Sequence, residues 1–137
     1  GLGDVYKRQG YNESTGTFYA NNISLSGNVN GGTIFNTALG LTTVASSANV
    51  TTINYANSAV FLSTVTENTQ IKPINFPANQ GIVLLKLTNG GSKTITYFGN
   101  CGFVGNTAPT LTSSGIDFLY IQGNTTHYSV FTQLDVR

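Results

Sequence analysis

The stretch that decides the fold lies between residues 81 and 98 and reads Gly-Ile-Val-Leu-Leu-Lys-Leu-Thr (81–88), Asn-Gly-Gly-Ser (89–92) and Lys-Thr-Ile-Thr-Tyr-Phe (93–98). The first and third parts are rich in aliphatic, aromatic and threonine residues, which favour β-strands. The link between them contains Asn and Gly, which accept the positive φ angles of hairpin turns. The stretch therefore predicts two antiparallel strands joined by a short hairpin.

Short runs of the same character occur on both sides of this hairpin, separated by turn residues. We expect strands at 50–55, 59–65, 70–71, 116–122 and 127–134. No window shows the periodicity of an amphipathic helix. Short strands with a turn signal about every 8–12 residues are typical of antiparallel sandwiches and barrels. The sequence thus predicts an all-β protein whose main domain is an antiparallel β-sandwich of the jelly-roll type.

Alternation within the strands predicts which side chains face the core. In the strand at 82–88, Val83, Leu85 and Leu87 share one face and are all apolar, whereas the other face includes a lysine. In the strand at 116–122 both faces are largely apolar. That pattern is typical of a strand covered on two sides, here by a neighbouring sheet or a neighbouring subunit.

The composition points to a protein embedded in an assembly. Only 8% of the residues are charged, against about 25% in an ordinary soluble domain. So few charges protect a surface weakly against association, which favours an oligomer or a larger particle. The net charge of +1, with scattered lysines, argues against nucleic acid as a partner. No apolar run reaches the length of about 18 residues that a membrane span needs, so we expect no membrane insertion.

The chain divides into three parts. Residues 4–9, Asp-Val-Tyr-Lys-Arg-Gln, look like a translated sequencing adaptor, so residues 1–9 are excluded from fold reasoning and we expect the chain to be a piece of a longer protein. Residues 10–49 are rich in Asn, Ser, Thr and Gly and are short of apolar residues. They predict a strand-rich, poorly packed shaft that winds with copies of itself, or a disordered linker. Residues 50–137 form the predicted β-sandwich domain.

Residues 64–131 resemble a C-terminal β domain of bacteriophage tail-fibre and other tail-associated structural proteins. The resemblance rests on the order of its features: Asn-Thr at 68–69, a Pro/Asn-rich loop at 73–80, Gly-Gly at 90–91, Thr-Ile-Thr-Tyr at 94–97, Ala-Pro-Thr-Leu-Thr at 108–112, an apolar strand with Asp117, and an aromatic strand at 128–131. Upstream, residues 23–37 look like the Gly/Asn repeats of fibre shafts. Such domains commonly carry Trp where this chain has Tyr97-Phe98 and His127-Tyr128, which puts ligand stacking attributed to those Trp positions in doubt.

The resemblance implies a non-enzymatic virion structural protein, the distal part of a tail fibre or tail appendage, exposed outside the host cell. It implies contacts with other virion tail proteins and with a host-surface glycan or protein. The low charge and the shaft's shortage of apolar residues predict that the chain assembles as a homotrimer. The loops expected to face outward are 73–80, 100–109 and 122–126. Three alternatives stay open: a carbohydrate-binding or adhesin module, a capsid decoration or baseplate protein, and a fragment of a polysaccharide depolymerase.

Residue patterns for catalysis or metal binding are weak. Glu67 and Asp117 are the acids that could approach each other, but nothing places them beside a cleft as glycoside hydrolysis requires. His127 lacks a Gly-x-Ser-x-Gly nucleophile motif, and Cys101 is the single cysteine. Gly90-Gly91-Ser92-Lys93 lacks the spacer of a phosphate loop. We therefore expect no enzyme activity, no catalytic residues, no metal and no cofactor.

Aromatic residues are the remaining candidates for ligand contact. Sugars stack on exposed aromatic rings, so we single out Tyr55, Tyr120 and Tyr128 as candidate ligand contacts. Packing in the core or between subunits is the alternative explanation for the same residues.

Overall fold

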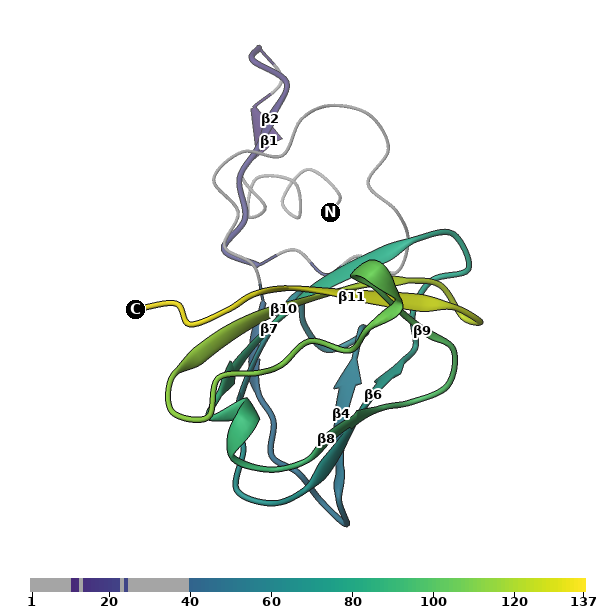
Figure 1. The fold of residues 1–137 in the computed structure, drawn as a ribbon. Coiled ribbons are helices and arrows are strands. Elements are labelled where there is room, and N and C mark those ends of the chain that lie inside the picture. The colour runs from purple at the N-terminus through teal and green to yellow at the C-terminus, as the bar shows by residue number, and fades with distance from the viewer. Residues whose placement is uncertain (1–10, 13, 23, 25–39) are drawn as a thin grey trace. The chain divides into compact units, whose positions relative to one another are not determined.

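The structure, a computed structural model, describes residues 11–12, 14–22, 24 and 40–137 (Figure 1). The chain splits into two units, Gly1–Asn36 and Thr37–Arg137. In the first unit, β1 (Tyr11–Asn12) pairs antiparallel with β2 (Thr17–Phe18). The adaptor-like residues 4–9 and, apart from residue 24, the predicted shaft repeats at 23–37 lie outside the described residues.

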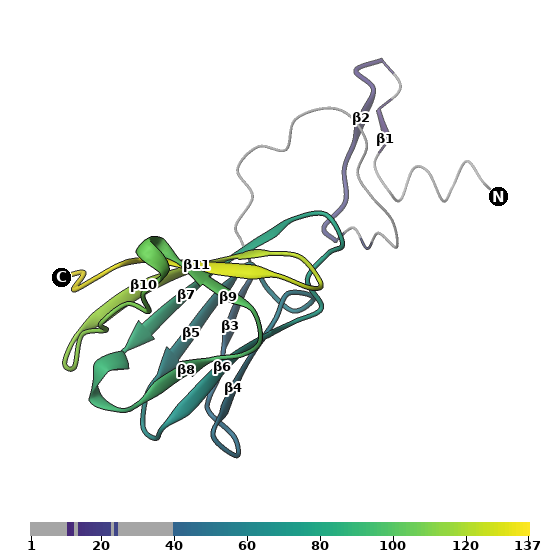
Figure 2. The same ribbon diagram turned by 45° about the vertical axis from the view of Figure 1, so that its right-hand side comes forward.

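The second unit contains two β-sheets (Figure 2). The larger sheet has six strands in the order β3 (Leu41–Thr43), β5 (Val60–Thr64), β7 (Gly81–Thr88), β10 (Ile116–Gly123), β11 (Tyr128–Gln133) and β9 (Cys101–Phe103). The smaller sheet has three strands in the order β4 (Val50–Asn54), β6 (Thr69–Ile74) and β8 (Ile95–Tyr97). The described helices are two single 3₁₀ turns, η1 (Gly90–Ser92) and η2 (Val104–Asn106).

The chain alternates between the two sheets and builds stacked coils. Strands β3, β5 and β7 lie parallel in the large sheet, and β4, β6 and β8 lie parallel in the small one. Each consecutive pair, such as β5 and β6, therefore makes one coil. The last coil is followed by β10 and β11, which extend the large sheet antiparallel, while β9 pairs parallel with β11 at its edge. The architecture is all-β, with mixed sheets and coils stacked as in a β-solenoid.

The prediction of an antiparallel, jelly-roll-like β-sandwich is wrong. Most of the pairs between described strands of the second unit are parallel; only β7–β10 and β10–β11 are antiparallel. Alternation of apolar residues predicts a strand and its buried face, but it carries no information about the direction of the neighbouring strand. The unit also begins before the predicted boundary at residue 50, because β3 belongs to the large sheet.

The predicted hairpin at 89–92 is likewise wrong, because the strands on either side of it enter different sheets. Asn89 has a positive φ of 58°, and Gly90–Ser92 form the 3₁₀ turn of a corner. This corner is tied to a distant loop, since Gly91 donates its N–H to the Thr112 carbonyl over 2.9 Å. A Cβ on Gly91 would collide with the Leu111 carbonyl. The glycine is thus needed for close backbone approach rather than for a hairpin turn.

The core lies between the two sheets. Val83, Leu85 and Leu87 are all buried, which confirms the face predicted for this strand. In β10 the buried face carries Leu119 and Ile121. From the small sheet, β4 and β6 contribute buried side chains to the same cluster, among them Ile53 and Ile71.

Candidate functional site

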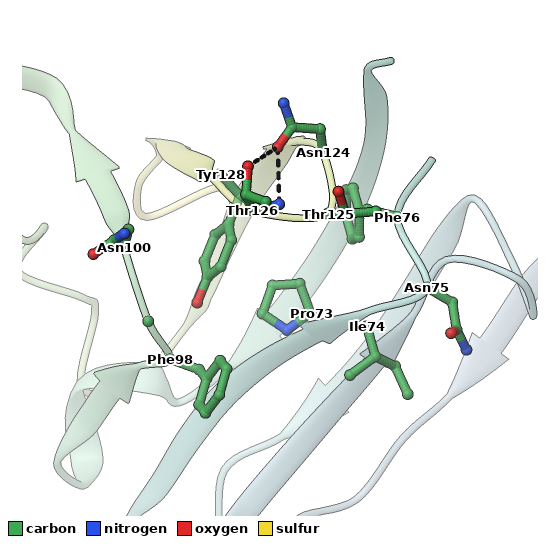
Figure 3. A pocket seen from close by; sticks show the side chains of 11 residues that line it. Pro73, Ile74, Asn75, Phe76, Phe98, Asn100, Asn124, Thr125, Thr126 and Tyr128 are labelled. Atoms are coloured by element: carbon green, nitrogen blue, oxygen red, sulfur yellow. Dashed lines mark hydrogen bonds between the residues drawn. The ribbon is translucent and has the colours of Figure 1, made fainter. Parts of the chain in front are cut away.

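A groove opens where three connections of the second unit converge (Figure 3). Its walls come from residues 73–76, which run from β6 into the loop before β7, from residues 98–100 between β8 and β9, and from the turn at 124–126 between β10 and β11. Tyr128 of β11 completes the lining. The groove has a volume of about 190 Å³. Parts of all three loops expected to face outward, 73–80, 100–109 and 122–126, therefore meet at one place.

The wall at 124–126 is a turn that the Asn124 side chain holds in shape. Its Oδ1 accepts hydrogen bonds from the Thr126 N–H at 3.0 Å, the Thr126 hydroxyl at 3.1 Å and the His127 N–H at 2.9 Å. Asn side chains stabilise turns in this way because they imitate a backbone carbonyl. The turn is therefore preformed before any ligand arrives.

The wall at 73–76 is fixed by a second asparagine. Asn75 has a positive φ of 57°, a conformation that Asn adopts more readily than most residues. Its side-chain nitrogen donates to the Asn54 Oδ1 over 2.9 Å. Behind it, the buried ring of Phe76 packs against Tyr55 with centroids 5.1 Å apart. This wall is thus anchored to both β4 and the core.

Tyr128 stands at the base of the groove. Figure 3 shows its ring between Asn100 and Pro73, with the hydroxyl directed toward Phe98. The side chain is 8% exposed, and its hydroxyl is buried with no hydrogen-bond partner among the described residues. Burial, with a smaller contribution from neighbouring Cys101, raises the pKa of Tyr128 to about 12. The hydroxyl therefore stays protonated and keeps an unused hydrogen-bonding capacity at neutral pH.

The third wall offers an exposed ring and an exposed amide. Phe98 is 42% exposed, and the Lys72 ammonium lies 4.7 Å from its ring centroid on one side. Asn100 is exposed, and its side chain makes no hydrogen bond to another described residue. The wall therefore combines an apolar surface with free donors and acceptors.

The lining suits an uncharged, hydroxyl-rich ligand. Among the described residues that line the groove, none carries a charge at neutral pH. Asparagine and threonine supply donors and acceptors in pairs, as sugar hydroxyls require. Phe98 and Pro73 supply apolar surfaces against which the C–H face of a sugar ring can pack, and the buried Tyr128 closes the base. The arrangement can bind and orient such a ligand.

The structure separates the three tyrosines singled out from the sequence. Tyr128 lines the groove. Tyr55 lies behind it, packed on Phe76. Tyr120 lies on the outer face of the large sheet, where its ring stacks on Phe131 at a centroid distance of 4.9 Å and an interplanar angle of 6°. The three residues therefore do not form one site.

The residues weighed for catalysis have different structural surroundings. Asp117 is fully buried and accepts hydrogen bonds from Thr112 and from the Asp135 backbone. Burial raises the pKa of Cys101 to about 11, so little thiolate is present at neutral pH. His127 is exposed on the turn. Within the described part of the chain, no three His, Cys, Asp or Glu side chains gather as metal ligands would.

Sequence reasoning missed several groove residues, chiefly Phe98, Asn75 and Asn100. Their loops were recognisable, but no local motif shows that the loops meet.

No protein-family model, curated protein or solved structure matches the chain. Among the described helices, none is both long and apolar enough to cross a bilayer.

Proposed function

We propose that this chain is a non-enzymatic structural protein of a phage virion, the distal part of a tail fibre or tail appendage, which attaches to a host surface by binding a neutral glycan. The observation that carries the proposal is the groove, where preformed loops present amides, hydroxyls and apolar rings without a charge. The order of sequence features shared with tail-fibre domains supports the virion assignment.

The assembly we propose is a homotrimer exposed outside the host cell. A groove of about 190 Å³ is small beside the roughly 300–1,000 Å³ of tight small-molecule sites. Single contacts are then weak, and three linked copies would raise the overall affinity because the later binding events become intramolecular. Weak sites multiplied in this way suit adhesion to a repetitive polysaccharide.

A glycan array screened with the full chain tests the binding, followed by calorimetric titration with the best neutral oligosaccharide. Phe98→Ala and Asn100→Ala each remove an exposed groove side chain and are expected to weaken binding at least about tenfold, which corresponds to about 1.4 kcal/mol. Leu134→Ala is the matched control, because Leu134 is 44% exposed and Phe98 is 42% exposed, and Leu134 does not line the groove.

Two results would count against the proposal. One is an array without any neutral glycan bound. The other is a titration in which both groove variants bind as tightly as the control. The virion assignment is tested separately by the genes next to this one, since neighbours that encode tail and packaging proteins are expected.

A further inference from the structure

The outer face of the large sheet carries a continuous apolar row. It consists of the side chains that alternate with the buried ones, and strand register places them directly side by side. The row crosses five strands in the order Leu41, Val60, Leu84, Tyr120, Phe131. Leu41 is 61% exposed and Phe131 is 38% exposed. Val60, Leu84 and Tyr120 between them are partly exposed.

Charge is almost absent from this face. Of the described strand residues that share it, only Lys86 is ionisable apart from Tyr120, and no acid lies there. Lys86 lies next to Leu62 and Phe118 in the adjoining row. A lysine stem can extend along an apolar surface and carry its ammonium to the rim. The face therefore selects neither a cationic nor an anionic partner.

The extent of the face follows from the geometry of the sheet. Six strands about 4.8 Å apart and about 20 Å long present roughly 500 Å² in projection, and the accessible area of corrugated side chains is larger. Monomers rarely expose apolar patches beyond a few hundred Å², whereas each partner in a stable interface buries about 800 Å². The largest apolar patch on a typical monomer measures about 300–600 Å² and is often functional, so a face of this size can supply the apolar centre of an interface, with polar residues around it completing the contact.

The two ends of the row differ in chemistry. The β3–β5 end is aliphatic, with Leu41 and Val60, and the β10–β11 end is aromatic, with stacked Tyr120 and Phe131. Branched aliphatic side chains and flat rings pack well on each other. A head-to-tail contact of one end on the other is heterologous, and such contacts form a closed ring where the rotation between neighbouring copies closes.

We propose that this face packs against neighbouring copies of the same chain, the β3–β5 end of one copy on the β10–β11 end of the next. The inference rests on the proposed homotrimer and names its contact surface. It leaves the glycan groove free, because the groove lies on the loops and its lining contains none of the five residues of the row.

Light scattering of the full chain during gel filtration tests the contact. The wild-type protein is expected at about three times the 14.5 kDa of one chain. Leu41→Lys and Phe131→Lys place a charge at opposite ends of the row, and each is expected to give a monomer with an unchanged far-UV spectrum. Leu134→Lys, which adds the same charge at another exposed apolar position, should stay trimeric.

A wild-type monomer at micromolar concentration overturns the inference, as does a trimer that persists in both folded row variants. Leu41 is the more exposed of the two positions, so Leu41→Lys decides the matter if Phe131→Lys fails to fold. Phe98→Ala distinguishes this inference from the proposed function, because it should weaken glycan binding at least about tenfold without changing the mass of the oligomer. If the wild-type protein is a trimer but binds no glycan, the proposed attachment is refuted and the proposed contact surface is not.

Discussion

Asp117 offers the sharpest test of how this fold is held together. Its carboxyl group is fully buried on β10 and joins three segments. Oδ2 accepts the Thr112 N–H over 2.7 Å, and Oδ1 accepts the Thr112 hydroxyl over 2.7 Å and the Asp135 N–H over 2.9 Å. Removing it with Asp117→Ala leaves two backbone donors without an acceptor and opens a small void.

The expected cost follows from these contacts. Each stranded donor costs about 1–3 kcal/mol, and a void of a few atoms adds about 1 kcal/mol. Because both donors are only partly buried, we expect Asp117→Ala to lower the free energy of unfolding by about 3–4 kcal/mol. Asp117→Asn keeps an oxygen for two of the donors but turns an N–H₂ group toward the third, so about 1–2 kcal/mol is expected.

Urea unfolding followed by far-UV circular dichroism measures both changes. With a slope of about 1.5 kcal/mol per molar, Asp117→Ala should shift the midpoint downward by about 2 M. Asp135→Asn is the control, since that exposed side chain pairs with Arg137 at the surface, and its midpoint should not move. An Asp117→Ala midpoint within error of the wild type would refute the reasoning, and equal losses for the Ala and Asn variants would refute the assignment of the individual bonds.

Three further predictions follow from burial and close packing. Burial raises the pKa of Tyr128 to about 12, so the stability that its protonated form contributes is complete below a pH of about 10 and is lost as the pH rises through the pKa of the folded protein. Urea midpoints measured between pH 9 and 12 should therefore fall less steeply for Tyr128→Phe than for the wild type. Parallel curves for the two proteins would contradict this. Because burial raises the pKa of Cys101 to about 11, iodoacetamide at pH 8 should label the folded protein at least about tenfold more slowly than the urea-unfolded protein, as mass spectrometry would show; equal rates would mean an accessible thiolate. Gly91→Ala forces a methyl group into the Leu111 carbonyl and should cost about 1–3 kcal/mol in urea unfolding, whereas Gly40→Ala, with its nearest neighbour at 3.5 Å, should stay within about 0.5 kcal/mol of the wild type.

Most strand positions and the buried faces were predictable because they are local properties, whereas the three-residue strands β3 and β9 lie where a linker and a loop were predicted. Val83, Leu85 and Leu87 alternate with partly exposed or exposed residues, and that pattern alone identifies their face. Strand partners were not predictable. Val60 pairs with Leu41 and Leu84, yet no repeated motif marks these three positions as equivalent in successive coils. The Gly90-Gly91 link was mispredicted as a hairpin because glycine is found both in hairpins and in corners between two sheets.

The candidate site was predictable only in part. The loops that form it stand out by their Pro, Asn and Gly content, and Tyr128 by its aromatic ring. Their convergence depends on which strands are neighbours, which the sequence pattern did not supply. Tyr120 illustrates the limit, because its ring is as suitable for stacking as that of Tyr128 but lies on the outer sheet face against Phe131.

The groove forms at the place where the stacked coils end. Strand β8 closes the small sheet, and the short link at 98–100 carries the chain across to β9, which pairs parallel with β11. That pairing sets the turn at 124–126 beside the link, while residues 73–76 supply the facing wall from an earlier coil. The exposed groove residues belong to the connections, whereas most of the core cluster belongs to the strands. Changes at Phe98 or Asn100 can therefore alter the surface of the groove without disturbing the packed sheets.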